Sequence, residues 1–146
     1  MTGKCCFGLT FANEGRFILS VAVLAAVEAG LILAGVLPLL GISSLGSMLF
    51  TLARIAVIAY MGWVLVKIGM KEIAIRGAIA QLAGFFVLCL ADLIGSYTGK
   101  SVLGTAIPSY YYLFFVFGFS AIVNAFMGAI FALCGAWLAS KFKRRK

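Results

Sequence analysis

Four long apolar runs constrain the fold of this chain more than any other feature of its sequence. They cover approximately residues 17–40, 48–68, 75–95 and 107–140. A helix needs about 20 apolar residues to cross the hydrocarbon core of a bilayer. Because backbone groups at membrane depth must pair within their own segment, such runs form helices rather than open strands. The sequence therefore predicts an all-α integral membrane protein, a single domain of four transmembrane helices joined by short loops.

The composition leaves no room for a separate soluble domain. Hydrophobic residues make up 64% of the 146 residues, whereas soluble domains are roughly half apolar. The chain contains no histidine, which excludes histidine-ligated metals and haem, Ser-His-Asp triads and histidine proton relays. We therefore expect a protein that is not an enzyme and that needs no cofactor.

The basic residues predict the orientation of the helices. If both termini are cytoplasmic, nearly all of the 12 lysines and arginines fall on the cytoplasmic side, as the positive-inside rule requires. A basic tail follows the last run directly, and a segment of this kind is typical of an anchor to anionic lipid headgroups. Its basic residues are Lys141, Lys143, Arg144, Arg145 and Lys146. Since the basic residues flank apolar runs and no folded nucleic-acid module is present, we expect no nucleic-acid partner.

Ionisable side chains inside the apolar runs are the best clue to function. Glu28 lies in the middle of the first run, Arg54 inside the second, and Asp92 near the end of the third. A charge at membrane depth costs roughly 2.5–3.5 kcal/mol on insertion scales, so such groups normally face a bundle interior, a cavity or a partner. Because an unpaired buried charge is very costly, Arg54 needs a partner, and both Glu28 and Asp92 are candidates.

Two polar residues extend this set of candidates. Gln81 and Asp92 are about three helical turns apart and so share one face of the third helix, and Asn124 lies near the middle of the fourth run. These groups, with Glu28 and Arg54, define a candidate polar track across the bundle. Two interpretations stay open. Either the track is functional, or an ion pair between Glu28 and Arg54 only fixes the register of the helices while Asp92 reaches the headgroups.

Small residues recur at every fourth position in two of the runs. In the first run they are Ala22, Ala26, Gly30 and Ala34, and in the fourth they are Ser120, Asn124, Gly128, Ala132, Ala136 and Ser140. Such strips let helix backbones approach closely in lipid. We therefore expect tight packing at Ala26 and Gly30 and at Gly128 and Ala132, with the first and fourth helices as candidate partners. Glu28 lies about 200° from the first strip and points the other way.

Two local motifs carry weaker signals. Cys5 and Cys6 are adjacent and close to the first run, so they are candidates for S-palmitoylation, with ordinary reduced thiols as the alternative. The loop sequence GSYTGKS, residues 95–101, resembles a phosphate-binding loop, but it has three residues rather than four before its Gly-Lys pair. It also lacks the preceding strand that such a loop needs, so we do not expect nucleotide binding.

Two functions from different classes fit these features. The first is a non-catalytic accessory subunit or tetraspan scaffold, assembled with other membrane subunits or with itself through small-residue helix faces and intramembrane ion pairs. The alternative is a small proton-coupled transporter that acts as a homodimer, in which Glu28 exchanges protons against a solute. Four short spans with a midmembrane glutamate in the first resemble the layout of the small multidrug resistance family, which implies transport. The resemblance covers that layout only, and the first function is the one we expect.

Overall fold

The computed structural model describes residues 5–37, 45–97, 102 and 110–143. These residues form four helices and no strand: α1 (Cys5–Leu33), α2 (Leu45–Val64), α3 (Met70–Tyr97) and α4 (Tyr110–Lys143). Each helix contains a stretch that is long and apolar enough to cross a membrane, and these stretches are Gly15–Leu33, Leu45–Val64, Met70–Ser96 and Phe117–Phe142. The prediction of an all-α, multi-pass integral membrane protein is confirmed.

The first helix ends earlier than the apolar run does. The sequence predicts a span that continues to residue 40, whereas α1 ends at Leu33. Gly35 adopts a left-handed backbone with φ of 77°, and the N–H of Val36 donates to the carbonyl of Leu31 at 2.9 Å. This is the usual way in which a glycine ends a helix. The remaining residues of the predicted span, 38–40, lie outside the described part of the chain.

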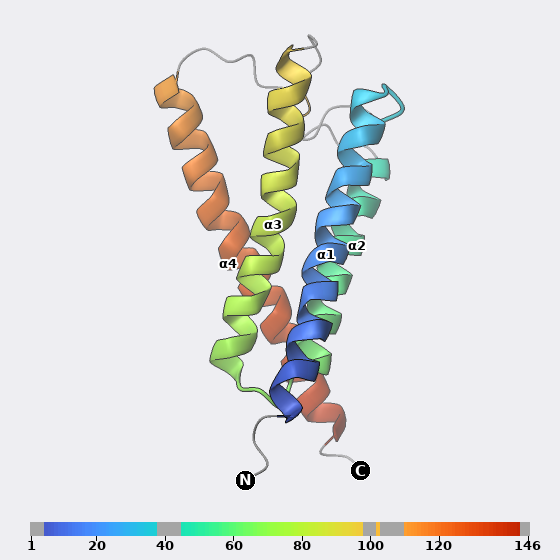
Figure 1. Cartoon of the computed structure of the whole chain (residues 1–146), viewed down its shortest axis with the longest axis vertical. Coiled ribbons are helices and arrows are strands. Elements are labelled where there is room, and N and C mark those ends of the chain that lie inside the picture. The colour runs from blue at the N-terminus through green and yellow to red at the C-terminus, as the bar shows by residue number, and fades with distance from the viewer. Residues whose placement is uncertain (1–4, 38–44, 98–101, 103–109, 144–146) are drawn as a thin grey trace.

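Two helices continue beyond the expected membrane spans at the end that holds the termini. α1 begins at Cys5, so the mixed segment before the first apolar run is also helical. α4 reaches Lys143 and takes up the start of the basic tail, while residues 144–146 lie outside the described part. The first turn of α1 and the last turn of α4 lie at the same end of the bundle (Figure 1).

The helices form a ring of contacts rather than pairing in every combination. α3 packs against α1 and α4, α2 packs against α4 and α1, and α2 also touches α3 across the bundle (Figure 1). In the described residues α1 and α4 make no contact with each other. The suggestion from the sequence that the first and fourth helices are partners is therefore wrong.

Small residues lie where α4 crosses its two neighbours. A Cβ added at Gly62 of α2 would meet the carbonyl oxygen of Ala132 in α4, and one added at Gly77 of α3 would meet the carbonyl oxygen of Gly128. The reverse also holds, because a Cβ added at Gly128 would meet the carbonyl oxygen of Gly77 and would also come within 2.6 Å of the Cβ of Gln81. The small-residue strip of α4 thus lies at both of its helix crossings, where it allows close backbone approach.

The small-residue strip of α1 has a different environment. Ala26 and Gly30 are exposed, as is Ala34 directly after the end of α1, while Ala22 is half-buried. No atom lies within 4 Å of a Cβ built on Gly30. The expectation that Ala26 and Gly30 pack against another helix of the same chain is therefore wrong. The buried face of α1 repeats at helical spacing on the other side and consists of Val21, Ala25, Glu28, Ala29 and Ile32.

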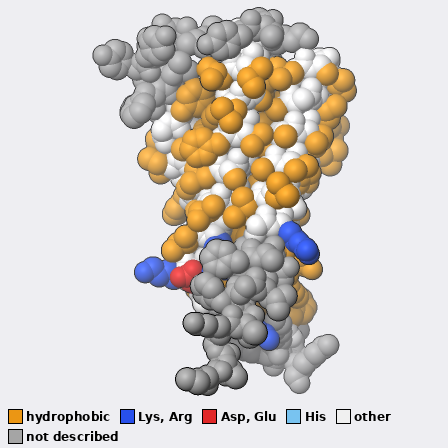
Figure 2. Space-filling model, viewed as in Figure 1, with side chains coloured by type: hydrophobic (Ala, Val, Ile, Leu, Met, Phe, Trp, Pro, Cys, Tyr) orange, Lys and Arg blue, Asp and Glu red, His pale blue; other side chains and the backbone are white. Residues whose placement is uncertain are grey.

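Aromatic and basic side chains gather at the end that holds the termini. The rings of Trp63 and Phe142 lie 5.7 Å apart, and the Lys141 Nζ atom lies 4.1 Å above the ring of Trp137. On the face drawn in the space-filling view, the described surface is largely apolar, and the visible lysine and arginine side chains lie toward this end (Figure 2). This pattern is typical of a membrane–water interface, where tryptophan rings and basic side chains meet the headgroups.

The helix crossings generate a prediction about stability. We expect Gly62→Ala to destabilise the bundle by about 1–3 kcal/mol, because the added methyl group overpacks the contact with the backbone of Ala132. The measurement is detergent unfolding followed by circular dichroism. Gly118→Ala is the matched control, since nothing lies within 4 Å of a Cβ at Gly118. Equal stability of the two variants would contradict the crossing.

Candidate functional site

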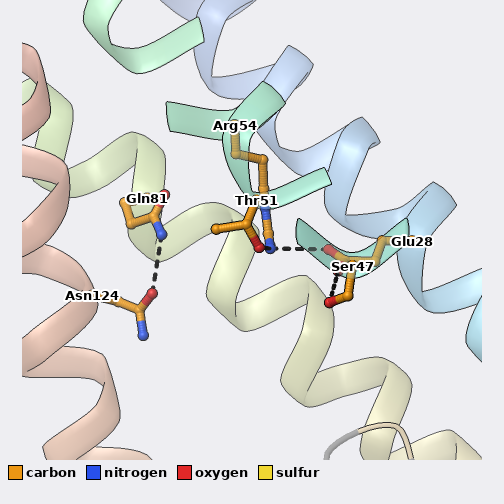
Figure 3. Close-up of polar contacts among 6 residues, drawn as sticks. All are labelled: Glu28, Ser47, Thr51, Arg54, Gln81 and Asn124. Atoms are coloured by element: carbon orange, nitrogen blue, oxygen red, sulfur yellow. Dashed lines mark hydrogen bonds and ion pairs between the residues drawn. The ribbon is translucent and has the colours of Figure 1, made fainter. Parts of the chain in front are cut away.

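A buried ion pair joins α1 to α2. Glu28 is fully buried and Arg54 is 6% exposed, and the Arg54 Nη2 and Glu28 Oε2 atoms lie 2.9 Å apart (Figure 3). Glu28 Oε2 nevertheless accepts no directed hydrogen bond from the described residues, so the contact is an electrostatic pairing rather than a well-aligned bond. Of the two partners that the sequence offers for Arg54, the structure selects Glu28.

Two hydroxyl side chains of α2 complete the surroundings of this pair. The Ser47 hydroxyl donates to Glu28 Oε1 at 3.0 Å, and Arg54 Nη2 makes a long hydrogen bond of 3.4 Å to the Thr51 hydroxyl (Figure 3). Ser47, Thr51 and Arg54 follow one another at spacings of four and three residues, which puts them on one face of the helix. α2 therefore presents a polar edge to the carboxylate of α1.

A second polar pair joins α3 to α4. The Gln81 Nε2 group donates to Asn124 Oδ1 at 3.1 Å, and Asn124 Nδ2 donates to the carbonyl oxygen of Ser120 in its own helix at 2.9 Å. The amides meet one turn away from the Gly77–Gly128 crossing, which holds the two backbones close. A hydrogen bond of this kind between membrane helices contributes about 0.6–2 kcal/mol.

Asp92 has a separate role near the C-terminal end of α3. Its side chain is 4% exposed, and its Oδ1 atom accepts a 2.6 Å hydrogen bond from the backbone N–H of Val102. The carboxylate thus holds the backbone of Val102 against α3. It is buried, so the interpretation that Asp92 only reaches the lipid headgroups is wrong.

The candidate polar track is divided into separate contacts. Glu28 and Arg54 form one pair and Gln81 and Asn124 form another, while Asp92 binds backbone. Sequence reasoning missed Ser47, Thr51 and Ser120 as members of these contacts. The sequence does carry a signal for Ser47 and Thr51, because their spacing from Arg54 puts all three on one helical face. Nothing in the sequence indicates that the Asn124 amide would donate its hydrogen bond to a backbone carbonyl.

The remaining candidate residues lie outside these contacts. Cys5 and Cys6 occupy the first turn of α1, where the structure describes the backbone but not the side chains. Lys141 stacks on Trp137 at the interface, the side chain of Lys143 is not described, and residues 144–146 lie outside the described part. In the described residues, no three His, Cys, Asp or Glu side chains lie close enough together to hold a metal ion.

Comparisons with protein-family models, with curated proteins and with solved structures found no match for this chain. The firm conclusion from sequence and structure is that it is an integral, multi-pass membrane protein with four membrane-spanning helices and a buried ion pair between the first two.

The ion pair generates a prediction about coupling. We expect Arg54→Met alone to destabilise the bundle by about 3–5 kcal/mol, because it leaves the Glu28 carboxylate buried and unpaired. The single variant Glu28→Gln, which leaves the guanidinium unpaired, should also destabilise the bundle. The double variant Glu28→Gln/Arg54→Met should recover much of the loss, since neither charge then remains. A double-mutant cycle of unfolding free energies measures this coupling.

One outcome of the double-mutant cycle would contradict the ion pair. If the losses of the two single variants simply add in the double variant, Glu28 and Arg54 do not pair inside the folded bundle. Ser96→Ala is a suitable control, because the Ser96 hydroxyl is exposed and bonds only to the nearby carbonyl of Leu93 at 2.7 Å.

Proposed function

We propose that this protein is a non-catalytic, four-helix membrane subunit that joins a larger membrane assembly through the exposed small-residue face of α1. Its exposed residues are Ala26 and Gly30 in α1 and Ala34 directly after the helix, while Ala22 of the same strip is half-buried. The observation that carries the proposal is the contrast between the two sides of α1. The charged side is buried within the chain, and the outward side bears the small residues Ala26 and Gly30 beside Val23 and Val27.

The ion pair supports an internal role for the charges. Glu28 has no exposed surface, its charge is balanced by Arg54, and its other oxygen is occupied by Ser47. A carboxylate that exchanges protons against a solute must be reached by water and by the solute, and a carboxylate that docks onto a partner must lie at the surface. The burial of Glu28 therefore argues against transport and against docking through this charge. The small-residue face is the better candidate for assembly.

The outward surface of α4 shows what an ordinary lipid-facing side looks like in this chain. Its large side chains stand well exposed, among them Phe119 at 63%, Ile122 at 70% and Phe126 at 67%. Bulky apolar side chains that face lipid lose little packing energy, because lipid tails are as apolar as they are. A strip of small residues gains packing energy when another helix backbone approaches it closely. We therefore assign the face of α1 to a transmembrane helix of a partner subunit that carries small residues of its own.

The orientation and the tail belong to the same proposal. Both termini face the cytoplasm, which is supported by the lysine and arginine side chains at that end of the bundle (Figure 2) and by the positive-inside rule. Lys141 above the ring of Trp137 starts a basic tail that binds anionic lipid headgroups. On this proposal, the tail fixes the depth of α4 while α1 makes the protein contact.

The proposal predicts the effect of a bulky side chain on assembly. We expect Gly30→Leu to shift the native mass of the gently solubilised protein from a complex to the single chain, because the leucine separates the two helix backbones. Gly118→Leu is the matched control, since it is also exposed and nothing lies within 4 Å of a Cβ at either glycine. Native mass spectrometry of both variants, with identification of the co-purifying membrane subunits, checks the result.

Three outcomes would contradict this function. The first is a wild-type protein that is a single chain, and the second is a complex that both leucine variants leave intact. The third is a homodimer with pH-dependent solute flux in liposomes that Glu28→Gln abolishes while the protein stays folded, which is the behaviour of a transporter.

A further inference from the structure

The four helices differ in the length of apolar helix that each must fit into the bilayer. The membrane-spanning stretches of α1 and α2 contain 19 and 20 residues, which is about 30 Å of helix and matches the hydrocarbon core. The stretch of α3 contains 27 residues, but Lys71, Glu72 and Arg76 lie in its first two turns. The part of α3 beyond them is also about 30 Å long, so these three helices fit the membrane without a large tilt.

α4 has more apolar length than the membrane can hold upright. Its stretch Phe117–Phe142 contains 26 residues, and the helix has no charged residue before Lys141. About 39 Å of apolar helix fits into a hydrocarbon core of about 30 Å at a tilt of roughly 40°. Figure 1 shows α4 inclined to the other helices, with its distal half, residues 117–127, leaning away from α3. The excess length accounts for this inclination.

The contacts of α4 are gathered in the half that follows. Its close backbone contacts with α3 and α2 lie at Gly128, Ala132 and Gly135, within about 10 Å of helix. None of the residues 117–127 is buried, and the Phe119 side chain is 63% exposed. A segment with few buried contacts is the part of a structure that moves most readily. The three small residues therefore form a pivot, and the distal half is the arm of a lever.

The end of α4 beyond the pivot is anchored. The Lys141 Nζ atom lies 4.1 Å above the ring of Trp137, and the ring of Phe142 lies 5.7 Å from that of Trp63 in α2. Aromatic and basic side chains of this kind hold a helix end at the membrane–water interface. A change in the tilt of α4 therefore displaces the distal half more than the anchored end.

We propose that the tilt of α4 follows the thickness of the bilayer. A thicker membrane accommodates the apolar stretch at a smaller tilt, which brings the distal half toward α3, and a thinner membrane moves it away. Crossings at small residues are compatible with angles as large as about 40°. The Gln81–Asn124 hydrogen bond lies one turn from Gly128, so it is displaced little and keeps the two helices tied. α4 thus converts membrane thickness into the separation of α3 and α4 at the end opposite the termini.

The test is double electron–electron resonance on the whole chain in phosphatidylcholine vesicles with myristoleoyl, oleoyl or erucoyl chains, which form bilayers of increasing thickness. Spin labels are attached at Phe86→Cys in α3 and Phe119→Cys in α4, two exposed positions, after the 4 native cysteines are replaced by serine. About 13 Å of helix separates Phe119 from Gly128. A decrease of roughly 20° in tilt between the thinnest and the thickest bilayer should therefore shorten the label distance by about 3–4 Å.

The matched control keeps the label at Phe86→Cys and moves the other to Leu19→Cys in α1, which is also exposed. α1 packs against α3 at this level, because a Cβ added at Gly84 would meet the side chain of Val21. Neither helix carries excess apolar length, so this distance should be the same in all three bilayers.

Each other outcome overturns the proposal. A Phe86–Phe119 distance that is equal in the three bilayers shows that the lipid or the helix ends absorb the excess length. Equal changes in this distance and in the Leu19–Phe86 distance show that the whole bundle deforms. A label at Ile122→Cys, which is nearer the pivot, should report a smaller shift than Phe119→Cys, and an equal or larger shift contradicts a pivot at Gly128. If Phe119→Cys does not fold, Ile122→Cys with Phe86→Cys decides.

Discussion

The ion pair between Glu28 and Arg54 is the interaction on which the rest of the structure depends. Neither charge is stable alone at membrane depth, because lipid offers no solvent to replace water. The pair therefore fixes how α1 and α2 lie relative to each other, since a rotation of either helix would turn a charge into lipid. Ser47 and Thr51 reinforce that register from α2. Once this edge is set, the apolar positions on the same face of α1 define the side that meets α3.

Close backbone contact provides the second constraint. Apolar side chains lose little by facing lipid instead of one another, so helix association depends on packing and on polar contacts. The crossings at Gly62 and Ala132 and at Gly77 and Gly128 supply the packing, and the Gln81–Asn124 amide pair supplies the polar contact. α4 thereby holds α2 and α3 together, while α1 is held by the ion pair and by its apolar contacts with α3. This arrangement leaves the outer face of α1 exposed.

The fold was predictable from the sequence because bilayer thickness sets the length of each apolar run, and four such runs are visible directly. The sequence limited the partners of Arg54 to Glu28 and Asp92 but did not choose between them, since both lie on helices next to the second in the chain. The role of Asp92 was not, because its partner is the backbone of Val102, and a backbone group carries no sequence signal.

The faces used for packing were harder to predict than the helices. The strips of α1 and α4 look alike in the sequence, yet only the strip of α4 lies at helix crossings. The difference depends on Glu28, whose burial turns the opposite side of α1 outward. Small residues alone therefore indicate only that a close helix contact is possible. The buried charge determines which side of the helix packs inside the bundle. The end of α1 depended likewise on the backbone of Gly35, not on hydrophobicity.

In the proposed function, Glu28 is an ionised structural carboxylate paired with Arg54, not a proton carrier. The most direct measurement is the infrared difference spectrum of the carboxyl groups between wild-type protein and Glu28→Gln in lipid at neutral pH. The chain has only four acidic side chains, so the contribution of one can be resolved. The ion pair predicts that the variant loses a carboxylate band. Loss of a protonated-acid carbonyl band instead would contradict it, because a neutral Glu28 cannot balance the charge of Arg54.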